Sequence, residues 1–251
     1  EIEVPAGAVR YRDYGIPGVA RYYRALAWND AGRSDTSNHA SASPQSPPTP
    51  STSNAADHTV VDLIRKGRIP IAAIEAAKTG LRIAYGHTSH GSQIADGMSG
   101  LVAFADAGRC DGTYDYSEEP GLFSWSQDGA GGSLRMAEDI GNYGSAYGAA
   151  DLNQPGYGAF EDATRSYLAS HPTVNVVMWS WCGGVSGADE DDIAVDYLAR
   201  MDHLETDYPD VRFVYMTGHG DGSGTGGNLA QRNTQIRTYC QTNGKWLFAF
   251  N

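Results

Sequence analysis

The chain carries four short apolar runs, and each run ends in a polar or glycine-rich segment. The runs are residues 81–85, 173–181, 211–217 and 245–250. Short apolar stretches bounded by turn residues are typical of strands. The second run reads Thr-Val-Asn-Val-Val-Met-Trp-Ser-Trp, and this nearly continuous apolar pattern indicates a central strand that is buried on both faces.

Between these runs, apolar residues recur at the three- and four-residue spacing of amphipathic helices. In the first such stretch Pro70 stands near the start and Gly80 just past the end, the usual order of these residues at helix termini. Alternating strands and helices predict an α/β domain whose mostly parallel sheet is covered by helices on both faces. The periodic stretches are residues 70–78, 94–105, 133–140, 160–168, 192–204 and 228–242.

The N-terminal part of the chain follows a different pattern. Residues 20–43 alternate bulky and polar side chains around an Asn-Asp-Ala-Gly turn, which predicts a β-hairpin. This stretch resembles the last strands of a fibronectin type III domain. Residues 44–53 are rich in proline and serine and predict a semi-rigid linker. We therefore expect partial fibronectin-like strands in residues 1–43, a linker in 44–56 and the α/β domain in 57–251.

The charge of the chain narrows the set of partners. Its 251 residues include 18 lysines and arginines against 30 aspartates and glutamates, which gives a formal net charge of −12. A chain this acidic is a poor partner for nucleic-acid phosphates and for anionic membrane surfaces, so we expect neither. No apolar run approaches the ~20 residues that a membrane-spanning helix requires.

Three cysteines, Cys110, Cys182 and Cys240, match neither the spacing of a zinc motif nor a redox Cys-x-x-Cys pair. They allow at most one disulfide. We expect Cys110 and Cys240 to be structural and Cys182 to be a buried thiol, because cysteine behaves as a small apolar residue when buried. We expect no cofactor.

The run at 81–85 leads into the most polar turn of the chain, Gly86-His-Thr-Ser-His-Gly-Ser92. Parallel strands end at one edge of a sheet, where α/β proteins bind their ligands. The loops 86–92, 182–187 and 218–227 should therefore meet at that edge. Together they hold a candidate nucleophile, candidate bases and an acid, namely Ser89, His87, His90, His219 and Asp221, with Cys182 beside them.

Ser89 is the candidate nucleophile, because a helix is expected to begin near Gly91. The Ser89 amide would then lie at the positive end of this helix and could hold an oxyanion. Further amides that could do so are those of Gly183 and of Gly131 or Gly132, since glycine permits close backbone approach. A second interpretation is that the hydroxyls of the turn only cap the helix.

The histidines also allow a metal-dependent hydrolase, although our assignment is a site without a metal. His87 and His90 are three residues apart, and His219 and Asp221 could complete the ligands. No His-Glu-x-x-His motif occurs in the sequence. The acidic residues 189–192 could bind calcium, but acidic residues at a helix start also stabilise the helix dipole.

The block Gly86-His-Thr-Ser-His-Gly91 resembles the first sequence block of the SGNH, or GDSL-like, serine hydrolases, in the branch that reads Gly-His-x-Ser-x-Gly. The similarity spans residues 57–251. It implies a three-layer α/β/α sandwich with a flavodoxin-like sheet, Ser89 as nucleophile, and Gly131 or Gly132 as the oxyanion donor of the second block. Other matching pieces are Trp-Ser-Trp-Cys-Gly at 179–183, Met-Thr-Gly-His at 216–219 and Asn-x-x-Ile-Arg-x-Tyr-Cys at 233–240.

Two features of that family are missing from the sequence. Trp-Cys-Gly-Gly at 181–184 stands where the family's third block reads Gly-x-Asn-Asp. The family's Asp-x-x-His follows the last strand, whereas this sequence stops at Asn251. Either the sequence is a piece of a longer enzyme, or His219 and Asp221 take these roles.

The combined prediction is a secreted or cell-surface serine esterase. It would hydrolyse short-chain acyl or carbohydrate esters, so its partner would be a small-molecule or polysaccharide ester. One alternative is the metal-dependent hydrolase that uses His87, His90, His219 and Asp221. The other is a non-catalytic adhesion or glycan-binding module, which the fibronectin-like strands and the surplus of aromatic residues favour.

Overall fold

The computed structural model describes residues 54–110, 112–143, 151–152 and 158–250, together with the short stretches 21–23, 28–29, 32–34 and 40–42. Contacts divide the chain into two compact units, Glu1–Thr52 and Ser53–Asn251. All of the predicted site residues belong to the larger unit.

The described residues of the smaller unit form two antiparallel strand pairs. β1 (Arg21–Tyr23) pairs with β4 (Ala40–Ala42), and β2 (Trp28–Asn29) pairs with β3 (Gly32–Arg33). Both pairs lie in the stretch for which the alternating pattern predicts a hairpin, and they are nested as in a hairpin. The predicted linker residues 44–53 lie outside the described residues, and the resemblance to a fibronectin domain stays a prediction.

In the larger unit, the described residues form a seven-stranded sheet in the order β5-β11-β10-β9-β6-β8-β7, and every strand pair is parallel. Read in the opposite direction, the five strands between β7 and β5 are β8, β6, β9, β10 and β11. Numbered along the chain from β6, they are second, first, third, fourth and fifth, which is the flavodoxin-like order. The strands are β5 (Ala55–Ala56), β6 (Arg82–Gly86), β7 (Trp125–Ser126), β8 (Leu134–Ala137), β9 (Val176–Trp179), β10 (Arg212–Met216) and β11 (Trp246–Phe248).

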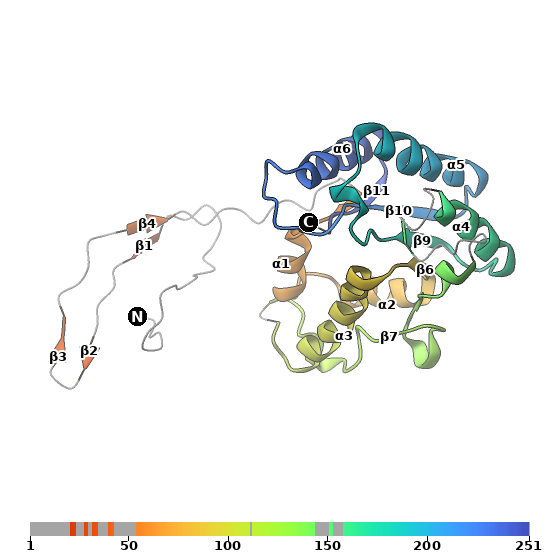
Figure 1. Cartoon of the computed structure of the whole chain (residues 1–251). Helices are drawn as coiled ribbons and strands as arrows, with labels where there is room; N and C mark the ends of the chain where they lie inside the picture. The colour runs from red at the N-terminus through yellow and green to blue at the C-terminus, as the bar shows by residue number, and fades with distance from the viewer. Residues whose placement is uncertain are drawn as a thin grey trace. The chain divides into compact units, whose positions relative to one another are not determined.

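Helices cover both faces of this sheet, so the predicted three-layer α/β/α sandwich is confirmed (Figure 1). One layer consists of α1 (Thr59–Arg65), α2 (Ile71–Gly80) and α3 (Ser92–Asp106). The other layer consists of α4 (Ala159–Ser170), the π-helix η6 (Asp192–Ala199) that continues as α5 (Arg200–Asp207), and α6 (Asn228–Asn243).

The strands fill both layers because successive side chains point to opposite faces. On β9, Val177 and Trp179 pack into the cluster under α4, α5 and α6, whereas Met178 packs with residues of α3. On β10, Phe213 and Tyr215 join the first cluster and Met216 joins the second. This two-sided burial explains why these strands read as almost continuous apolar runs.

The stretch 133–140 is not the predicted helix, because its residues 134–137 form β8. They pair with β6 in the register Arg82↔Arg135, Ile83↔Met136 and Ala84↔Ala137. Met136 is 1% exposed and packs on α3, so burial between two strands overrides a composition that suits a helix. No pattern in the sequence analysis predicts β7 either, which pairs with β8.

Three element boundaries differ from the sequence-based ones. Residues 55 and 56, predicted as linker, form β5 at the edge of the sheet, where the Leu247 amide donates to the Asn54 carbonyl at 2.8 Å. Gly80 is the last residue of α2 rather than the residue after it. The helix predicted at 192–204 begins as the π-helix η6.

None of the three cysteines forms a disulfide. Cys240 lies on the buried face of α6, and burial raises the pKa of its thiol to about 12. Cys182 is half-buried, so the prediction of a buried thiol is wrong for this residue. Across the described residues, no helix has both the length and the apolar character to span a bilayer.

Candidate active site

The carboxyl ends of β6, β8, β9 and β10 lie at one edge of the parallel sheet. The flavodoxin-like order reverses direction between β6 and β9, and such a reversal opens the crevice in which α/β proteins bind ligands. The predicted loops 86–92, 182–187 and 218–227 all follow strands at this edge. They share it with residues 138–143, a segment that the helix prediction for 133–140 had hidden.

Ser89 opens a short 3₁₀ turn, η1 (Ser89–Gly91), between β6 and α3. Its side chain is exposed, and its hydroxyl makes no hydrogen bond among the described residues. Two hydrogen bonds close the turn. The Gly91 amide donates to the Thr88 carbonyl at 2.7 Å, and the Ser92 hydroxyl donates to the Ser89 carbonyl at 2.7 Å. Neither η1 nor α3 has a side-chain cap, so the capping interpretation of these hydroxyls is not supported.

Two glycines allow this turn to lie directly on β9. A Cβ atom on Gly86 would stand 2.1 Å from a ring carbon of Trp179, and one on Gly91 would stand 2.3 Å from the Ser180 hydroxyl oxygen. The Tyr85 hydroxyl donates to the Gly91 carbonyl at 2.8 Å, and burial raises the pKa of Tyr85 to about 12. The position of Ser89 is therefore set by close backbone packing.

His87 is the histidine that a carboxylate holds. Its Nε2 lies 2.8 Å from Glu138 Oε1, and its ring stacks on Tyr85 at 4.7 Å between centroids. Glu138 is fixed in turn by Gln127, whose amide donates to Oε2 at 2.7 Å and whose carbonyl oxygen accepts from the Glu138 amide at 2.8 Å. The second ring nitrogen, Nδ1, is buried without a partner, so His87 points its free nitrogen into the protein.

His90 and His219 stack on each other, with ring centroids 3.7 Å apart and an angle of 18° between the planes. Both nitrogens of His219 face carbonyl oxygens, Nε2 that of Cys182 and Nδ1 that of Gly220 at 3.0 Å. His90 Nδ1 lies 3.9 Å from the sulfur of Cys182, and Nε2 has no hydrogen-bond partner in the described part of the chain. Of the three histidines at this edge, His90 thus has the most accessible free nitrogen.

Asp221 does not support His219, contrary to the sequence-based prediction. Its carboxylate accepts from the Ser223 hydroxyl at 2.6 Å, the Ser223 amide at 2.8 Å and the Ser186 hydroxyl at 2.7 Å. The hydrogen bonds from these two serines lower the pKa of Asp221 to about 2. Asp221 therefore ties the glycine-rich loop after β10 to the loop after β9.

The geometry does not favour the metal alternative. Within the described ranges, no three histidine, cysteine or acidic side chains converge as metal ligands would. His87 is engaged by Glu138, and the parallel rings of His90 and His219 face each other rather than a common point. The Asp192 amide donates to the Asp189 carboxylate at 2.8 Å, and the Asp189 amide donates to the Asp192 carboxylate at 2.9 Å. These bonds cap the start of the helix, so the two carboxylates are not arranged as calcium ligands.

The predicted oxyanion donors Gly131 and Gly132 lie at the wrong edge of the sheet. Both precede β8, whereas Ser89 follows β6, and the two strands are parallel. The glycine that follows β8, on the side of Ser89, is Gly141. Gly183 does follow the neighbouring strand β9, as predicted, and the Ser89 amide has no acceptor within η1 because it belongs to the first residue.

The Thr88 hydroxyl donates to the carboxylate of Asp151, a residue that is only 1% exposed. This contact of the turn was not predicted from sequence. Asp151 lies in a segment without a strand or helix pattern, and Glu138 lies in the stretch for which the pattern predicts a helix. The pairing of β8 with β6 brings Glu138 to this turn, and the hydrogen bond from the Leu152 amide to the Ser180 carbonyl at 3.1 Å holds the segment of Asp151 beside it.

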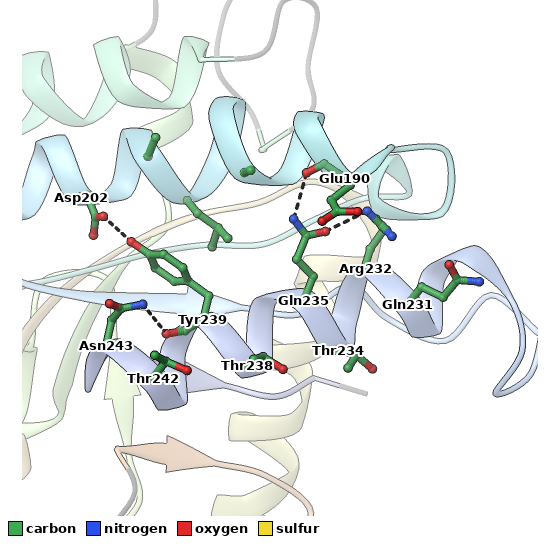
Figure 2. A pocket seen from close by; sticks show the side chains of 13 residues that line it. Glu190, Asp202, Gln231, Arg232, Thr234, Gln235, Thr238, Tyr239, Thr242 and Asn243 are labelled. Atoms are coloured by element: carbon green, nitrogen blue, oxygen red, sulfur yellow. Dashed lines mark hydrogen bonds between the residues drawn. The ribbon is translucent and has the colours of Figure 1, made fainter.

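A groove of about 680 Å³ lies elsewhere, along η6, α5 and α6 (Figure 2). Its polar groups bond one another, as in the contacts of Tyr239 with Asp202 and of Gln235 with the Glu190 carbonyl (Figure 2). None of the residues that line it comes from the 86–91 turn, so the candidate site and the groove are separate.

Comparison with protein-family models finds no match, and comparison with curated proteins and with solved structures finds no similar protein.

Proposed function

We propose that this chain is a serine hydrolase that cleaves carboxylic esters. The observation that carries the proposal is the Ser89 hydroxyl, which is exposed and unbonded at the carboxyl end of β6, beside the point where the strand order reverses. A nucleophilic serine requires such access together with a base and amide donors nearby. The resemblance of the 86–91 block to SGNH hydrolases points to the same residue.

In the proposed reaction, Ser89 Oγ attacks the ester carbonyl carbon while its proton passes to Nε2 of His90. The carbonyl oxygen becomes an oxyanion that the Ser89 amide holds, with Gly183 and Gly141 as the donors at the ends of the two strands flanking β6. The imidazolium then protonates the leaving alkoxide as the carbon–oxygen bond breaks. A water molecule attacks the acyl-enzyme by the same route, which releases the acid and restores the Ser89 hydroxyl.

Two neighbouring groups prepare His90 and Ser89 for these roles. The His219 ring, held by two carbonyl oxygens, fixes the plane of the His90 ring by stacking on it. Glu138 holds the His87 side chain, two residues before Ser89. Ser89 and His90 are not hydrogen-bonded in the free protein, and catalytic hydrogen bonds often form only once substrate is bound.

Covalent labelling with a fluorophosphonate probe, followed by peptide mapping, tests the proposal. We expect the label on Ser89, loss of labelling in Ser89→Ala, and normal labelling in the control Ser170→Ala, an exposed serine whose hydroxyl donates within α4. His90→Gln should slow labelling more than His87→Gln, and a chelator should have no effect. An active esterase whose Ser89 stays unlabelled would contradict the proposal, and so would activity that a chelator abolishes.

A further inference from the structure

The segments that follow the strands at the edge of Ser89 contain no lysine or arginine. The sequence has none in residues 83–108, 136–164, 166–199 or 213–231. Each of these four segments contains the carboxyl end of one of the strands β6, β8, β9 and β10, together with the loop that follows it. The groups there that can become cationic are therefore the histidines.

Carboxylates, in contrast, surround the Ser89 turn closely. The two residues that precede Ser89 each bond one, His87 to Glu138 and Thr88 to Asp151. Asp221, in the loop next to His219, accepts from two serine hydroxyls and the Ser223 amide, and no ion pair of it occurs among the described residues. With a pKa of about 2 it is anionic throughout the working range of a hydrolase.

From this charge pattern we infer that the ester accepted at Ser89 carries no negative charge on its acyl or alcohol part. The inference rests on the proposed esterase function and narrows its substrate class to uncharged esters, with cationic ones tolerated. An anionic group would enter a site that offers it carboxylates and no guanidinium or ammonium partner, so it would lose its hydration without compensation.

The three histidines cannot replace such a partner. His87 is engaged by Glu138, so its charge when protonated is already balanced. His219 turns both nitrogens to carbonyl oxygens, and His90 is the base of the proposed reaction. Sites that select carboxylate or phosphate groups instead use arginine as a bidentate donor or lysine as a point charge.

Three acetate esters of similar size test the inference: acetylcholine, its uncharged isostere 3,3-dimethylbutyl acetate, and the anionic acetate ester of 3-hydroxypropanesulfonate. At low salt we expect kcat/KM for the anionic ester to be about tenfold or more below that of the uncharged ester, since local potential alters association by such factors. The gap should narrow at high salt, because screening weakens the repulsion.

Asp221→Asn provides a matched charge change, with Asp210→Asn as control at the opposite edge of the sheet. Removal of the Asp221 charge should raise the relative rate for the anionic ester about two- to threefold, by an estimate for one partly screened charge. Asp210→Asn should leave the ratio of kcat/KM for the anionic ester to that for the uncharged ester unchanged.

Equal rates for the anionic and uncharged esters, or a preference for the anionic one, would overturn the inference and leave the serine esterase intact. No turnover of any of the three, combined with an unlabelled Ser89, would overturn the proposed function and the inference with it. If none of the three esters is hydrolysed although Ser89 is labelled, the inferred substrate class is overturned and Ser89 remains the proposed nucleophile.

Discussion

The two edges of the parallel sheet differ in how completely their polar groups are satisfied. At the amino edge, Asn175 joins neighbouring strands, because its side chain accepts from the Arg82 amide at 2.8 Å and donates to the Gly80 carbonyl at 2.7 Å. Lys245, just before β11, donates to Asp202 at 2.6 Å and also to Glu205. Arg212 lies over the Trp246 ring at 4.4 Å. Each of these groups has found a partner within the fold.

The carboxyl edge keeps polar atoms without partners. The Ser89 hydroxyl and His90 Nε2 are unbonded among the described residues, and the buried atoms His87 Nδ1 and Ser180 Oγ have no hydrogen bond. Buried polar atoms are nearly always paired, so an unpaired group marks strain or function. The contrast indicates that the amino edge stabilises the fold while the carboxyl edge is kept for a ligand.

Ser89→Ala gives the largest effect that this contrast predicts. We expect ester hydrolysis to fall ~10⁴-fold or more, as in serine hydrolases that lose their nucleophile. The free energy of unfolding should change by no more than about 0.5 kcal/mol, because the side chain is exposed and unbonded. Steady-state kinetics and urea unfolding measure both quantities. A variant that keeps its activity would show that the free hydroxyl has no catalytic role.

Gly91→Ala should damage both stability and activity. The new Cβ would stand 2.2 Å from the His87 Cβ and 2.3 Å from Ser180 Oγ, so we expect a loss of about 1–3 kcal/mol from overpacking and a displaced Ser89. Gly97→Ala in α3 is the matched control, because nothing lies within 4 Å of its Cβ position. That control should stabilise the protein by about 0.5–1 kcal/mol. Equal effects of the two changes in urea unfolding would contradict the close packing of the turn.

Lys245→Met tests the amino edge. The half-buried ammonium group bridges Asp202 and Glu205, so we expect a loss of about 1–2 kcal/mol in the free energy of unfolding. Labelling of Ser89 should keep its rate. Lys78→Met, which removes a pair with Glu75 in one helix, should lose about 0.5 kcal/mol or less. A large loss of labelling with little change in stability would reverse the roles of the two edges.

Much of this contrast follows from sequence, and the missing part has a physical cause. The long apolar runs at 173–181 and 211–217 identify β9 and β10 because strands buried on both faces have a distinct pattern. β8 was missed because Leu-Arg-Met-Ala are good helix formers, and only its pairing with β6 makes it a strand. Because β8 was missed, Glu138 was not identified from sequence, nor was it evident that Gly131 and Gly132 precede a strand parallel to β6. The π-helix and the Ser186–Asp221 contact leave no local pattern either.

Glu138→Gln should lower the esterase activity, but by less than Ser89→Ala does. The amide can still bond His87 and Gln127 but no longer offers His87 a charge, so we expect about a tenfold lower kcat/KM. The matched control Asp139→Asn, one residue along the chain, changes the bond with Tyr167 and should leave kcat/KM almost unchanged. The pH profile of kcat/KM separates an effect on the site from mere loss of stability, because loss of the Glu138 charge acts on the titration of the base His90, whereas loss of folded protein lowers the rate equally at every pH. An unshifted profile with unchanged kcat/KM would show that Glu138 serves the fold alone.

The smallest effect concerns the loop that Asp221 anchors. Its pKa of about 2 lies below the ordinary value of 3.8, so the ionised carboxylate is favoured by the folded loop. The contribution of this anchor is fully present above pH ~4 and is lost as the pH falls through about 2. A carbon-13 titration of the Asp221 carboxyl by NMR should therefore give a midpoint near 2, and the Ser223 amide shift should follow it. Asp221→Asn should abolish both transitions. A midpoint at or above 3.8 would mean that the serine contacts do not hold the loop in solution, and the carboxyl edge would then be less ordered than the amino edge.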